Sequence, residues 1–220
     1  MKQLLLLLLL LGELAAATHP VSGRPIAPVM GVGGADWLVR PEREMEENPE
    51  KALELIGIPK GAAVADLGAG VGYYSLKLAQ LTGPEGKVWA TDIQPEMLRL
   101  LRQRAAKGGL RNIETILGGE TETNLPVAGM DLILLVDVYH EFSEPQKMLR
   151  SIAKALKPDG RLVLLEFRKE DPKVPIREEL KMSIPMVKLE LEAEGYKLDR
   201  VIDGLPWQHI FVFQKGPRIQ

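Results

Sequence analysis

Three glycines follow a short apolar run in the stretch ADLGAGVGYYS, residues 65–75. Glycine has no side chain, so a turn rich in it lets the backbone approach a ligand closely. Gly68, Gly70 and Gly72 are spaced G-x-G-x-G, whereas a dinucleotide-binding loop would need its third glycine where Tyr73 stands. A P-loop needs Gly-Lys followed by Ser or Thr, which this stretch does not have. The spacing therefore disfavours a nicotinamide oxidoreductase and a nucleoside triphosphate site.

A carboxylate follows at the offset where nucleotide-binding folds meet a ribose. Asp92 ends the apolar stretch KVWATD, about 20 residues after the last loop glycine. Its oxygens would accept hydrogen bonds from both ribose hydroxyls and would repel a 2′-phosphate. A ribose site beside a loop without the pyrophosphate spacing fits an adenosine that carries no phosphates. S-adenosylmethionine is such a molecule, and Asp66 nearby would favour its positive sulfonium and ammonium groups.

Short apolar segments alternate with amphipathic ones after residue 57, which predicts strands separated by helices. Strands that are apolar on both faces are typical of a parallel sheet covered on both sides, with right-handed crossovers. Only GLPWQ separates the last two apolar segments, which predicts an antiparallel hairpin. We therefore predict an α/β fold, a Rossmann-like three-layer sandwich whose seven-stranded, mostly parallel sheet ends in a hairpin. The predicted strands are AAVADL, KVWATD, IETILG, MDLILLVDV, GRLVLLEF, KLDRVID and HIFVFQK.

The first residues have the pattern of a secretory signal peptide. One basic residue, Lys2, precedes eight consecutive leucines and a small-residue patch that ends at Ala17. We expect residues 1–17 to be removed and the protein to be exported, periplasmic or extracytoplasmic. The alternatives are an uncleaved membrane anchor and a cytoplasmic protein. The apolar run is short for a bilayer, so no stable membrane span is expected in the mature chain.

Residues 18–57 are predicted to form a lid segment followed by helices. Residues 19–40 are rich in Gly and Pro and show no period, yet they contain apolar side chains that should dock on the domain. Asn48 before Pro49 predicts the start of a helix, and Gly57 predicts its end. Residues 58–216 form the predicted ligand-binding domain. The charged stretch 168–181 is predicted to be a solvated loop.

The composition narrows the classes of function. The 220 residues include 28 Lys and Arg and 30 Asp and Glu, with a formal net charge of −2. No basic run could follow a phosphate backbone, so nucleic acid is not expected as a partner. The absence of cysteine excludes disulfides, thiolate nucleophiles and Cys-ligated metals. Three scattered histidines predict no metal site.

The chain is similar to the class I S-adenosylmethionine-dependent methyltransferases over residues 58–216. The resemblance rests on five stretches in the family's order: VADLGAGVG, ATDIQPEML, GGETETNLP, LILLVDVYHEF and LKPDGRLVLLEF. The fifth is similar to the same region of the ubiquinone/menaquinone-biosynthesis C-methyltransferases and their small-molecule relatives. The resemblance implies a sheet ending in a hairpin, S-adenosyl-L-methionine as cofactor, and in-line methyl transfer to a small-molecule acceptor.

The resemblance also implies which residues contact the cofactor. Gly68, Ala69 and Gly70 would lie under its methionyl part, and Asp66 near its amino group. The alternative for these glycines is a tight strand–helix turn with no ligand. Two further candidates in the loop are Gly72 and Tyr73. The alternative to a cofactor contact is the same tight turn for Gly72 and packing between helix and sheet for Tyr73.

At the next strands, the resemblance implies that Asp92 holds the ribose hydroxyls and that Ile93 lies beside the adenine. Glu120 would lie near the adenine amine, and Asp137 would close the floor of the site at the end of the fourth strand. Gly119 stands where the family would be expected to have Asp, so the acidic residue near the adenine could be displaced by one position from Glu120. Asp92 as a helix cap and Glu120 as a plain loop residue are the alternatives.

His140 and Tyr139 are the candidate catalytic residues. They follow the fourth strand in DVYHEF, at the edge of the sheet where ligands bind in open α/β folds. An imidazole there could act as a general base, and structural packing is the alternative for both residues. Methyl transfer itself requires mainly alignment and a dry pocket.

Two segments are expected to face the acceptor because loops at this edge carry specificity. They are the N-terminal stretch with Met30 and Trp37, which we expect to cover the site, and EDPKVPIREELKM. The fourth strand is not followed by Asn-Pro-Pro-Tyr, which disfavours amino-group methylation of nucleic acid or protein glutamine. Export would place the protein where the supply of S-adenosylmethionine is doubtful. A catalytically retired binding protein with the methyltransferase fold is therefore the alternative function.

Overall fold

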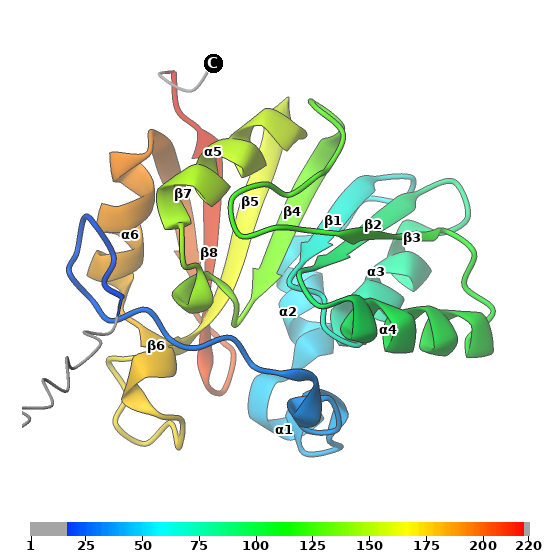
Figure 1. The fold of residues 1–220 in the computed structure, drawn as a ribbon, viewed down its shortest axis with the longest axis horizontal. Helices are drawn as coiled ribbons and strands as arrows, with labels where there is room; N and C mark the ends of the chain where they lie inside the picture. The colour runs from blue at the N-terminus through cyan, green and yellow to red at the C-terminus, as the bar shows by residue number, and fades with distance from the viewer. Residues whose placement is uncertain (1–16, 218–220) are drawn as a thin grey trace, which may run out of the picture.

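The computed structural model describes residues 17–217. Eight strands of these residues form one sheet, in the order β3-β2-β1-β4-β5-β8-β7, with β6 paired to β5 (Figure 1). The pairs β1–β2, β1–β4, β2–β3 and β4–β5 are parallel, and β8 is antiparallel to both β5 and β7. The strands are β1 (Ala63–Leu67), β2 (Lys87–Asp92), β3 (Ile113–Leu117), β4 (Met130–Val136), β5 (Leu156–Arg168), β6 (Lys181–Met182), β7 (Tyr196–Ile202) and β8 (Gln208–Lys215).

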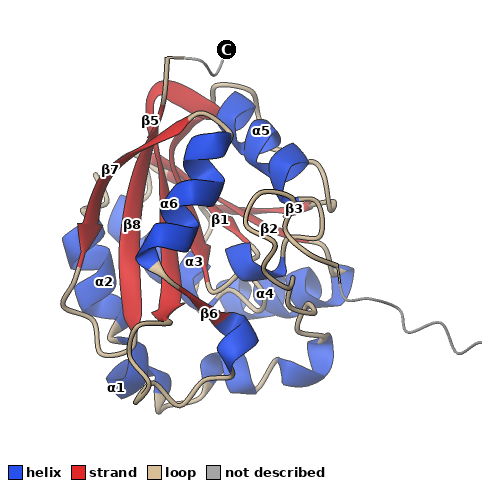
Figure 2. Cartoon of the chain, turned by 90° about the vertical axis from the view of Figure 1, so that its left-hand side faces the viewer, coloured by secondary structure: helices blue, strands red, loops and turns tan. Residues whose placement is uncertain are grey.

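Helices cover both faces of the sheet, so the predicted α/β three-layer fold with a terminal hairpin is confirmed (Figure 2). One face packs against α2, α3 and α4, and the other against α5 and α6. The helices are α1 (Arg43–Glu47), α2 (Pro49–Ile56), α3 (Tyr73–Thr82), α4 (Pro95–Lys107), α5 (Pro145–Ala155) and α6 (Ile184–Ala193), with 3-10 turns η1 (Val32–Gly34), η2 (Trp37–Val39), η3 (Tyr139–Glu141) and η4 (Glu178–Leu180).

The central strands are apolar because both of their faces are covered. In β4, the side chains from Leu132 to Leu135 are at most 1% exposed. Alternate residues of the strand enter the two main clusters of the core, Leu132 and Leu134 on one side and Ile133 and Leu135 on the other. The unbroken apolar sequence of these strands is therefore explained by a parallel sheet that is covered on both faces.

The helix boundaries follow local signals. The Asn48 side chain accepts a hydrogen bond from the Lys51 N–H at 3.3 Å, Pro49 is the first residue of α2, and Gly57 ends it in a left-handed conformation. Both predicted ends of that helix are therefore confirmed. The Ser183 side chain caps α6 in the same way, accepting from the Met186 N–H at 3.4 Å.

The N-terminal segment, residues 18–40, docks on the domain through buried charges. Arg24 is 7% exposed, and its Nε donates to both carboxylate oxygens of Glu190 on α6, at 2.9 and 3.2 Å. The Nε2 atom of His19 lies 3.3 Å from the same carboxylate. From there the segment crosses the carboxyl edge of the sheet towards α1, where it is drawn in blue (Figure 1). A buried ion pair thus fixes where the segment begins its crossing.

The stretch 168–181 is more ordered than the solvated loop predicted from its charges. It contains the turn η4, and Lys181 begins β6, which pairs in parallel with Phe167 and Arg168 at the end of β5. Lys181 and Met182 are buried. This two-residue strand adds an eighth member to the seven predicted, and its shortness explains why no periodic signal revealed it.

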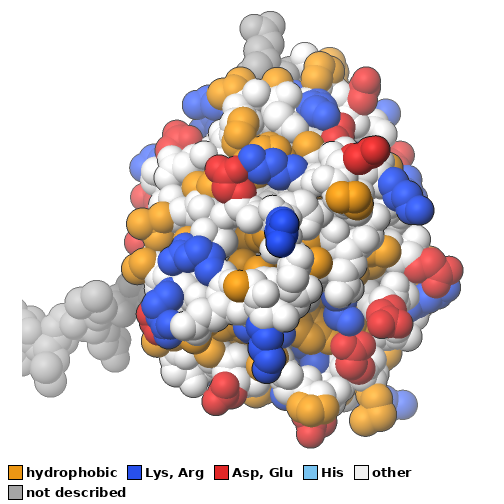
Figure 3. Space-filling model, turned by 90° about the vertical axis from the view of Figure 1, so that its right-hand side faces the viewer, with side chains coloured by type: hydrophobic (Ala, Val, Ile, Leu, Met, Phe, Trp, Pro, Cys, Tyr) orange, Lys and Arg blue, Asp and Glu red, His pale blue; other side chains and the backbone are white. Residues whose placement is uncertain are grey.

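The predicted signal peptide lies outside the described residues except for Ala17, and its removal and the expected export stay predictions. Among residues 17–217, no helix combines the length and the apolar character needed to cross a bilayer. On the face shown in Figure 3, basic and acidic side chains are interspersed.

Gly72 offers a test of the close packing between the glycine loop and α4. Its φ is +83°, and a Cβ at this position would lie 2.5 Å from the Leu101 Cγ. We expect Gly72→Ala to lower the free energy of unfolding by about 3 kcal/mol or more, from backbone strain and overpacking together.

Gly109 is the control for this substitution. Its φ is +67°, but a Cβ added there would have open space within 4 Å among the described residues. Gly109→Ala should cost about 1 kcal/mol in denaturant unfolding. Equal losses in the two variants would contradict the packing argument.

Candidate active site

A cavity of about 620 Å³ opens at the carboxyl ends of β1, β2 and β4, where open α/β sheets bind ligands. The N-terminal segment and the loop around η4 supply two of its walls. Its lining includes Gly68, Gly70, Asp92, Ile93, Glu120, Asp137 and His140, all predicted from the sequence as site residues. The other predicted residues, Asp66, Ala69, Gly72, Tyr73 and Tyr139, do not line it.

The loop between β1 and α3 presents bare backbone to the cavity. Gly68 and Gly70 have φ of +76° and +52°, a region that favours glycine. A Cβ on Gly68 would lie 2.5 Å from the Val138 side chain, and one on Gly70 would lie 2.9 Å from Leu38. The Thr91 carbonyl accepts the N–H groups of Gly68 and Ala69, at 2.9 and 2.8 Å. The loop is therefore held to β2 and is kept close to the walls of the cavity.

Asp92 links this loop to the end of β2. One carboxylate oxygen accepts the Gly70 N–H at 2.8 Å, and the other accepts the Gln94 N–H at 2.8 Å. Burial raises the pKa of Asp92, while these two backbone donors act to lower it. Each oxygen keeps a free lone pair on a side chain that lines the cavity, so the carboxylate can shape the loop and still accept from a ligand diol.

Asp66 lies behind the loop and not in the cavity. Its carboxylate accepts the Ser75 hydroxyl of α3 at 2.5 Å, and burial raises its pKa to about 6. Tyr73 points to Glu44 of α1, to which its hydroxyl donates a hydrogen bond. Gly72 packs against Leu101, as described above. Asp66, Tyr73 and Gly72 therefore support the loop from behind and do not line the cavity. The sequence alone does not distinguish supporting residues of this kind from residues that contact the ligand.

Asp137 lies at the end of β4 in a left-handed conformation, with φ of +54°. Gln208 donates to one carboxylate oxygen at 2.8 Å, and the other oxygen is buried without a partner among the described residues. Burial, together with the nearby Glu47 and Glu166, raises the pKa of Asp137 well above its usual range, and Arg43 opposes the rise. The carboxyl group at the end of β4 is therefore buried and incompletely satisfied among the described residues.

The two candidate catalytic residues are neighbours in η3, but their side chains lie in different places. His140 lines the cavity, with its Nδ1 2.7 Å from the Glu166 carboxylate. Tyr139 is fully buried, and its hydroxyl lies 3.2 Å from the Nε2 of His19. The structure thus brings His140 to the cavity and places Tyr139 in the core beneath the N-terminal segment. His209 of the terminal hairpin contacts Asp203 and Glu170 and does not line the cavity.

Met30 and Trp37 of the N-terminal segment, which the sequence predicts to cover the site, line the cavity. The Met30 N–H donates to Glu141 at 3.2 Å, and the Met30 carbonyl accepts from the Gln94 side chain at 2.9 Å. Trp37 stacks with Arg40, whose guanidinium carbon lies 3.6 Å from the ring centroid. The backbone of Met30 is therefore held by polar contacts at both its N–H and its carbonyl.

Sequence reasoning missed several polar residues of the lining, among them Arg43, Gln94 and Glu141. Arg43 is buried, and it donates to the Leu38 carbonyl at 2.8 Å and to Glu47 at 2.7 Å. In the sequence it is one charge among many in the stretch PEREMEE, and nothing marks it as buried. Glu141 directly follows His140, which the sequence predicts to lie at the carboxyl edge of the sheet. That neighbouring position was the signal that could have identified Glu141 as a lining residue.

Comparison with known proteins agrees with this geometry. The family described as "Methyltransferase domain" matches residues 58–214. The ubiquinone/menaquinone biosynthesis C-methyltransferase UbiE of Pasteurella multocida is 32% identical over 118 residues, which are 53% of this chain and 44% of that protein. The Pseudomonas putida (strain GB-1) enzyme is 32% identical over 126 residues, 57% of this chain and 49% of that protein. The matches thus span about half the length of these curated relatives.

The crystal structure of an S-adenosylmethionine-dependent methyltransferase from Aquifex aeolicus superposes with a TM-score of 0.80. The two are 30% identical, and the match covers 84% of this chain and 98% of that one. Fold and site together define a class I S-adenosylmethionine-dependent methyltransferase. The chain belongs to the methyltransferase domain family, and S-adenosylmethionine is the cofactor that this membership gives it.

The residues of the cavity fit that cofactor. Gly68 and Gly70 expose backbone on which a methionyl chain can lie, and Asp92 has lone pairs for a ribose diol. Asp137 also lines the cavity, although its unpartnered oxygen is itself buried. Within the described part of the chain, the lining adds no phosphate-binding pattern of glycines or basic side chains, in line with an adenosine that carries no phosphates.

Glu141 makes the cover sensitive to pH. Burial raises the pKa of Glu141 to about 7 from an ordinary value of 4.5, and Glu166 and Asp92 add to the rise. Between these values the folded state keeps a proton that the unfolded state has released. The free energy of unfolding therefore falls as pH rises through this window.

Glu141→Gln removes the titrating group and keeps an oxygen for the Met30 N–H. We expect it to stabilise the protein at pH 8 by about 2–3 kcal/mol relative to the original residue, and by much less at pH 5. Denaturant unfolding at both pH values measures the difference. Glu144→Gln on the surface is the control and should show no such pH dependence. An identical shift at pH 5 and pH 8 would refute the argument.

Proposed function

We propose that the protein transfers a methyl group from S-adenosylmethionine to a small-molecule acceptor that binds in the same cavity. One observation carries the proposal: the glycine loop with Asp92 and the imidazole of His140 line a single cavity of about 620 Å³. A cavity of this size holds an adenosine-based cofactor with a small second molecule. The similarity to proteins named as C-methyltransferases supports methyl transfer as the reaction type.

The chain's own residues divide between the two ligands. Gly68, Gly70, Asp92, Ile93 and Asp137 would hold the cofactor, as they line the end of the cavity formed by β1, β2 and β4. When bound, S-adenosylmethionine supplies a methyl group activated by the positive sulfonium. The protein then has to align the acceptor with that group and exclude water.

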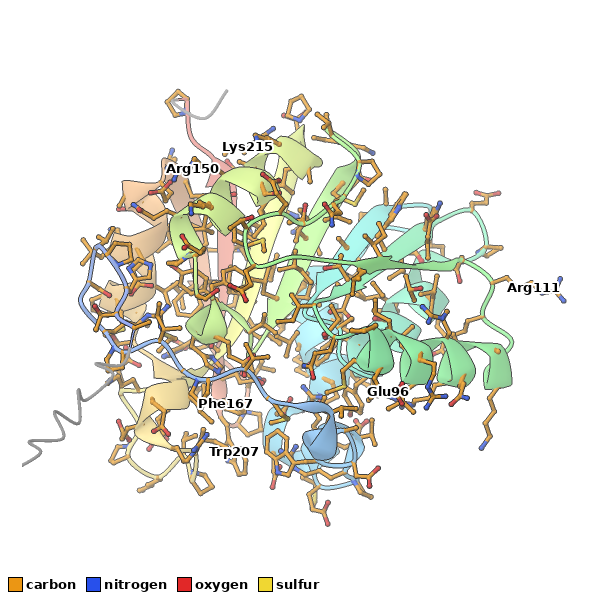
Figure 4. All side chains as sticks on the ribbon, in the orientation of Figure 1. Glu96, Arg111, Arg150, Phe167, Trp207 and Lys215 are labelled. Atoms are coloured by element: carbon orange, nitrogen blue, oxygen red, sulfur yellow. The ribbon has the colours of Figure 1, made fainter. Side chains whose placement is uncertain are left out.

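Apolar side chains line much of the remaining cavity, beside polar residues such as Arg43 and Glu141, and favour a small, largely apolar acceptor. They come from η3, from the end of β5 and from the loop around η4, and include Phe142, Phe167, Ile176 and Leu180. Figure 4 labels Phe167 at the lower end of β5, below the N-terminal segment. Trp37 and Met30 of the N-terminal segment also line the cavity. A pocket enclosed in this way favours a small molecule over a side chain on a folded protein.

Calorimetry and a methylation screen test the proposal. The protein should bind S-adenosylmethionine and S-adenosylhomocysteine but not the nicotinamide dinucleotides. In the presence of a small-molecule extract, it should release S-adenosylhomocysteine and form a methylated product seen by mass spectrometry. A protein that binds neither S-adenosylmethionine nor S-adenosylhomocysteine would contradict the proposal. Binding without any turnover would favour the retired binding protein.

Asp92→Asn tests the ribose contact. The amide loses the charge and one acceptor, so a charged hydrogen bond of about 2–3 kcal/mol is lost and the Kd for S-adenosylmethionine should rise about 30- to 100-fold. The control is Asp131→Asn in β4, because Asp131 also accepts a backbone N–H, from Ala63 at 2.8 Å, but does not line this cavity. That variant should bind the cofactor normally. A Kd that is unchanged in Asp92→Asn would remove Asp92 from the cofactor site.

A further inference from the structure

A buried carboxylate lies directly behind the imidazole that lines the cavity. Glu166, near the end of β5, has no exposed surface. One of its oxygens accepts the Tyr139 N–H at 2.9 Å, and the other lies 2.7 Å from the Nδ1 of His140. Both oxygens thus bind the same short turn, η3, which carries the candidate base.

The carboxylate determines which imidazole nitrogen carries the proton. An ionised carboxylate only accepts hydrogen bonds, so at 2.7 Å the Nδ1 of His140 is the donor. In the neutral ring, the lone pair then lies on Nε2. Nε2 has no hydrogen-bond partner within residues 17–217, and it is not among their buried unpartnered polar atoms. With the Nδ1 edge turned to Glu166, the basic nitrogen is the one left to face the cavity.

The backbone of His140 is also held in place. Its carbonyl accepts the Ala27 N–H at 3.1 Å and the Nη1 of Arg24 at 3.0 Å. Arg24 is in turn bound to Glu190 of α6. The imidazole therefore belongs to a turn that is fixed on one side by β5 and on the other by the N-terminal segment, which limits its rotation.

Four charged or titratable groups lie around the turn that carries this imidazole. Glu166 contributes from β5, Glu141 from η3 itself and Arg24 from the N-terminal segment. Asp137, at the end of β4, lies near enough to Glu166 to interact with it electrostatically. Of these four, Glu166 is the group that contacts the ring, so its removal should change the ring's tautomer most directly.

We propose that Glu166 is a positioning residue that makes His140 a general base, and that the acceptor reacts through an acidic hydroxyl, aromatic or enolic. This rests on the proposed function. Imidazole is a weak base, so it can remove a proton from a hydroxyl of pKa near 10 but not from an alcohol. The O–H bond breaks with its proton passing to Nε2, and the oxygen forms an O–CH3 bond. The S–CH3 electron pair stays on sulfur and leaves S-adenosylhomocysteine.

The tautomer can be measured without an acceptor. With ¹⁵N-labelled histidine and bound S-adenosylhomocysteine at pH 8, long-range NMR correlations should show His140 with its proton on Nδ1. Only three histidines need assignment, and His140→Gln identifies the signals. In Glu166→Gln, the amide nitrogen or oxygen can face the ring, so the Nε2-protonated form should appear. A proton on Nε2 in the unsubstituted protein would overturn the proposal.

Kinetics with two phenols then test the base. With phenol, Glu166→Gln should lower kcat about 100-fold while the affinity for S-adenosylhomocysteine stays within about twofold. With 4-nitrophenol, which is largely ionised at pH 8, the loss should shrink to less than about tenfold, because no proton remains to be removed. Glu194→Gln is the matched control. Glu194 also accepts two donors, from Gln146 at 2.7 Å and Arg150 at 3.0 Å, but it lies at the end of α6 away from the cavity, and its replacement should leave both rates unchanged.

The outcomes separate this proposal from the proposed function. Equal losses with the two phenols would make Glu166 merely structural and overturn the dyad. Methylation at carbon, or of thioethers or tertiary amines alone, would overturn the hydroxyl acceptor. A protein that binds S-adenosylmethionine and methylates other compounds but neither phenol would also overturn it. Failure to bind S-adenosylmethionine, or binding without turnover of any compound, would count against the methyltransferase function itself.

Discussion

The site depends on the hydrogen bonds that tie the glycine loop to the end of β2. The Thr91 carbonyl accepts from Gly68 and Ala69, and the Asp92 carboxylate accepts from Gly70 and Gln94. These bonds exist because β1 and β2 pair in parallel, so both strands end at the same edge of the sheet. A loop held in this way needs residues that tolerate positive φ close to other atoms, and glycine meets that requirement.

The second constraint is the burial of charge under the N-terminal segment. Arg24 and Glu190 are far apart in the sequence and form a buried ion pair. Arg24 also holds the turn that carries His140. Burying such a pair is weak support for stability, because desolvation offsets much of the attraction. Its effect here is geometric: it fixes the start of the segment that goes on to cover the cavity with Met30 and Trp37.

Local patterns predicted most of the fold because the central strands are covered on both faces and the helices carry strong end signals. Asn48, Pro49 and Gly57 defined α2, and the unbroken apolar run of β4 defined a central strand. The patterns missed β6, since two residues carry no period, and they assigned the charged stretch before it to solvent although Lys181 is buried. The pairing of Lys181 with Phe167 depends on the path of the chain in space.

The sequence by itself determined the fold class, the glycine loop and the carboxylate of Asp92, because each depends on residues close together in the chain or on a fixed spacing. Only the tertiary structure decided which candidates reach the cavity. Asp66 and Tyr139 turn away into the core, while Arg43 and Glu141 line the cavity and Glu166 lies directly behind His140. Those positions depend on which side of a strand or turn faces its neighbours, and that is set by packing between segments distant in sequence.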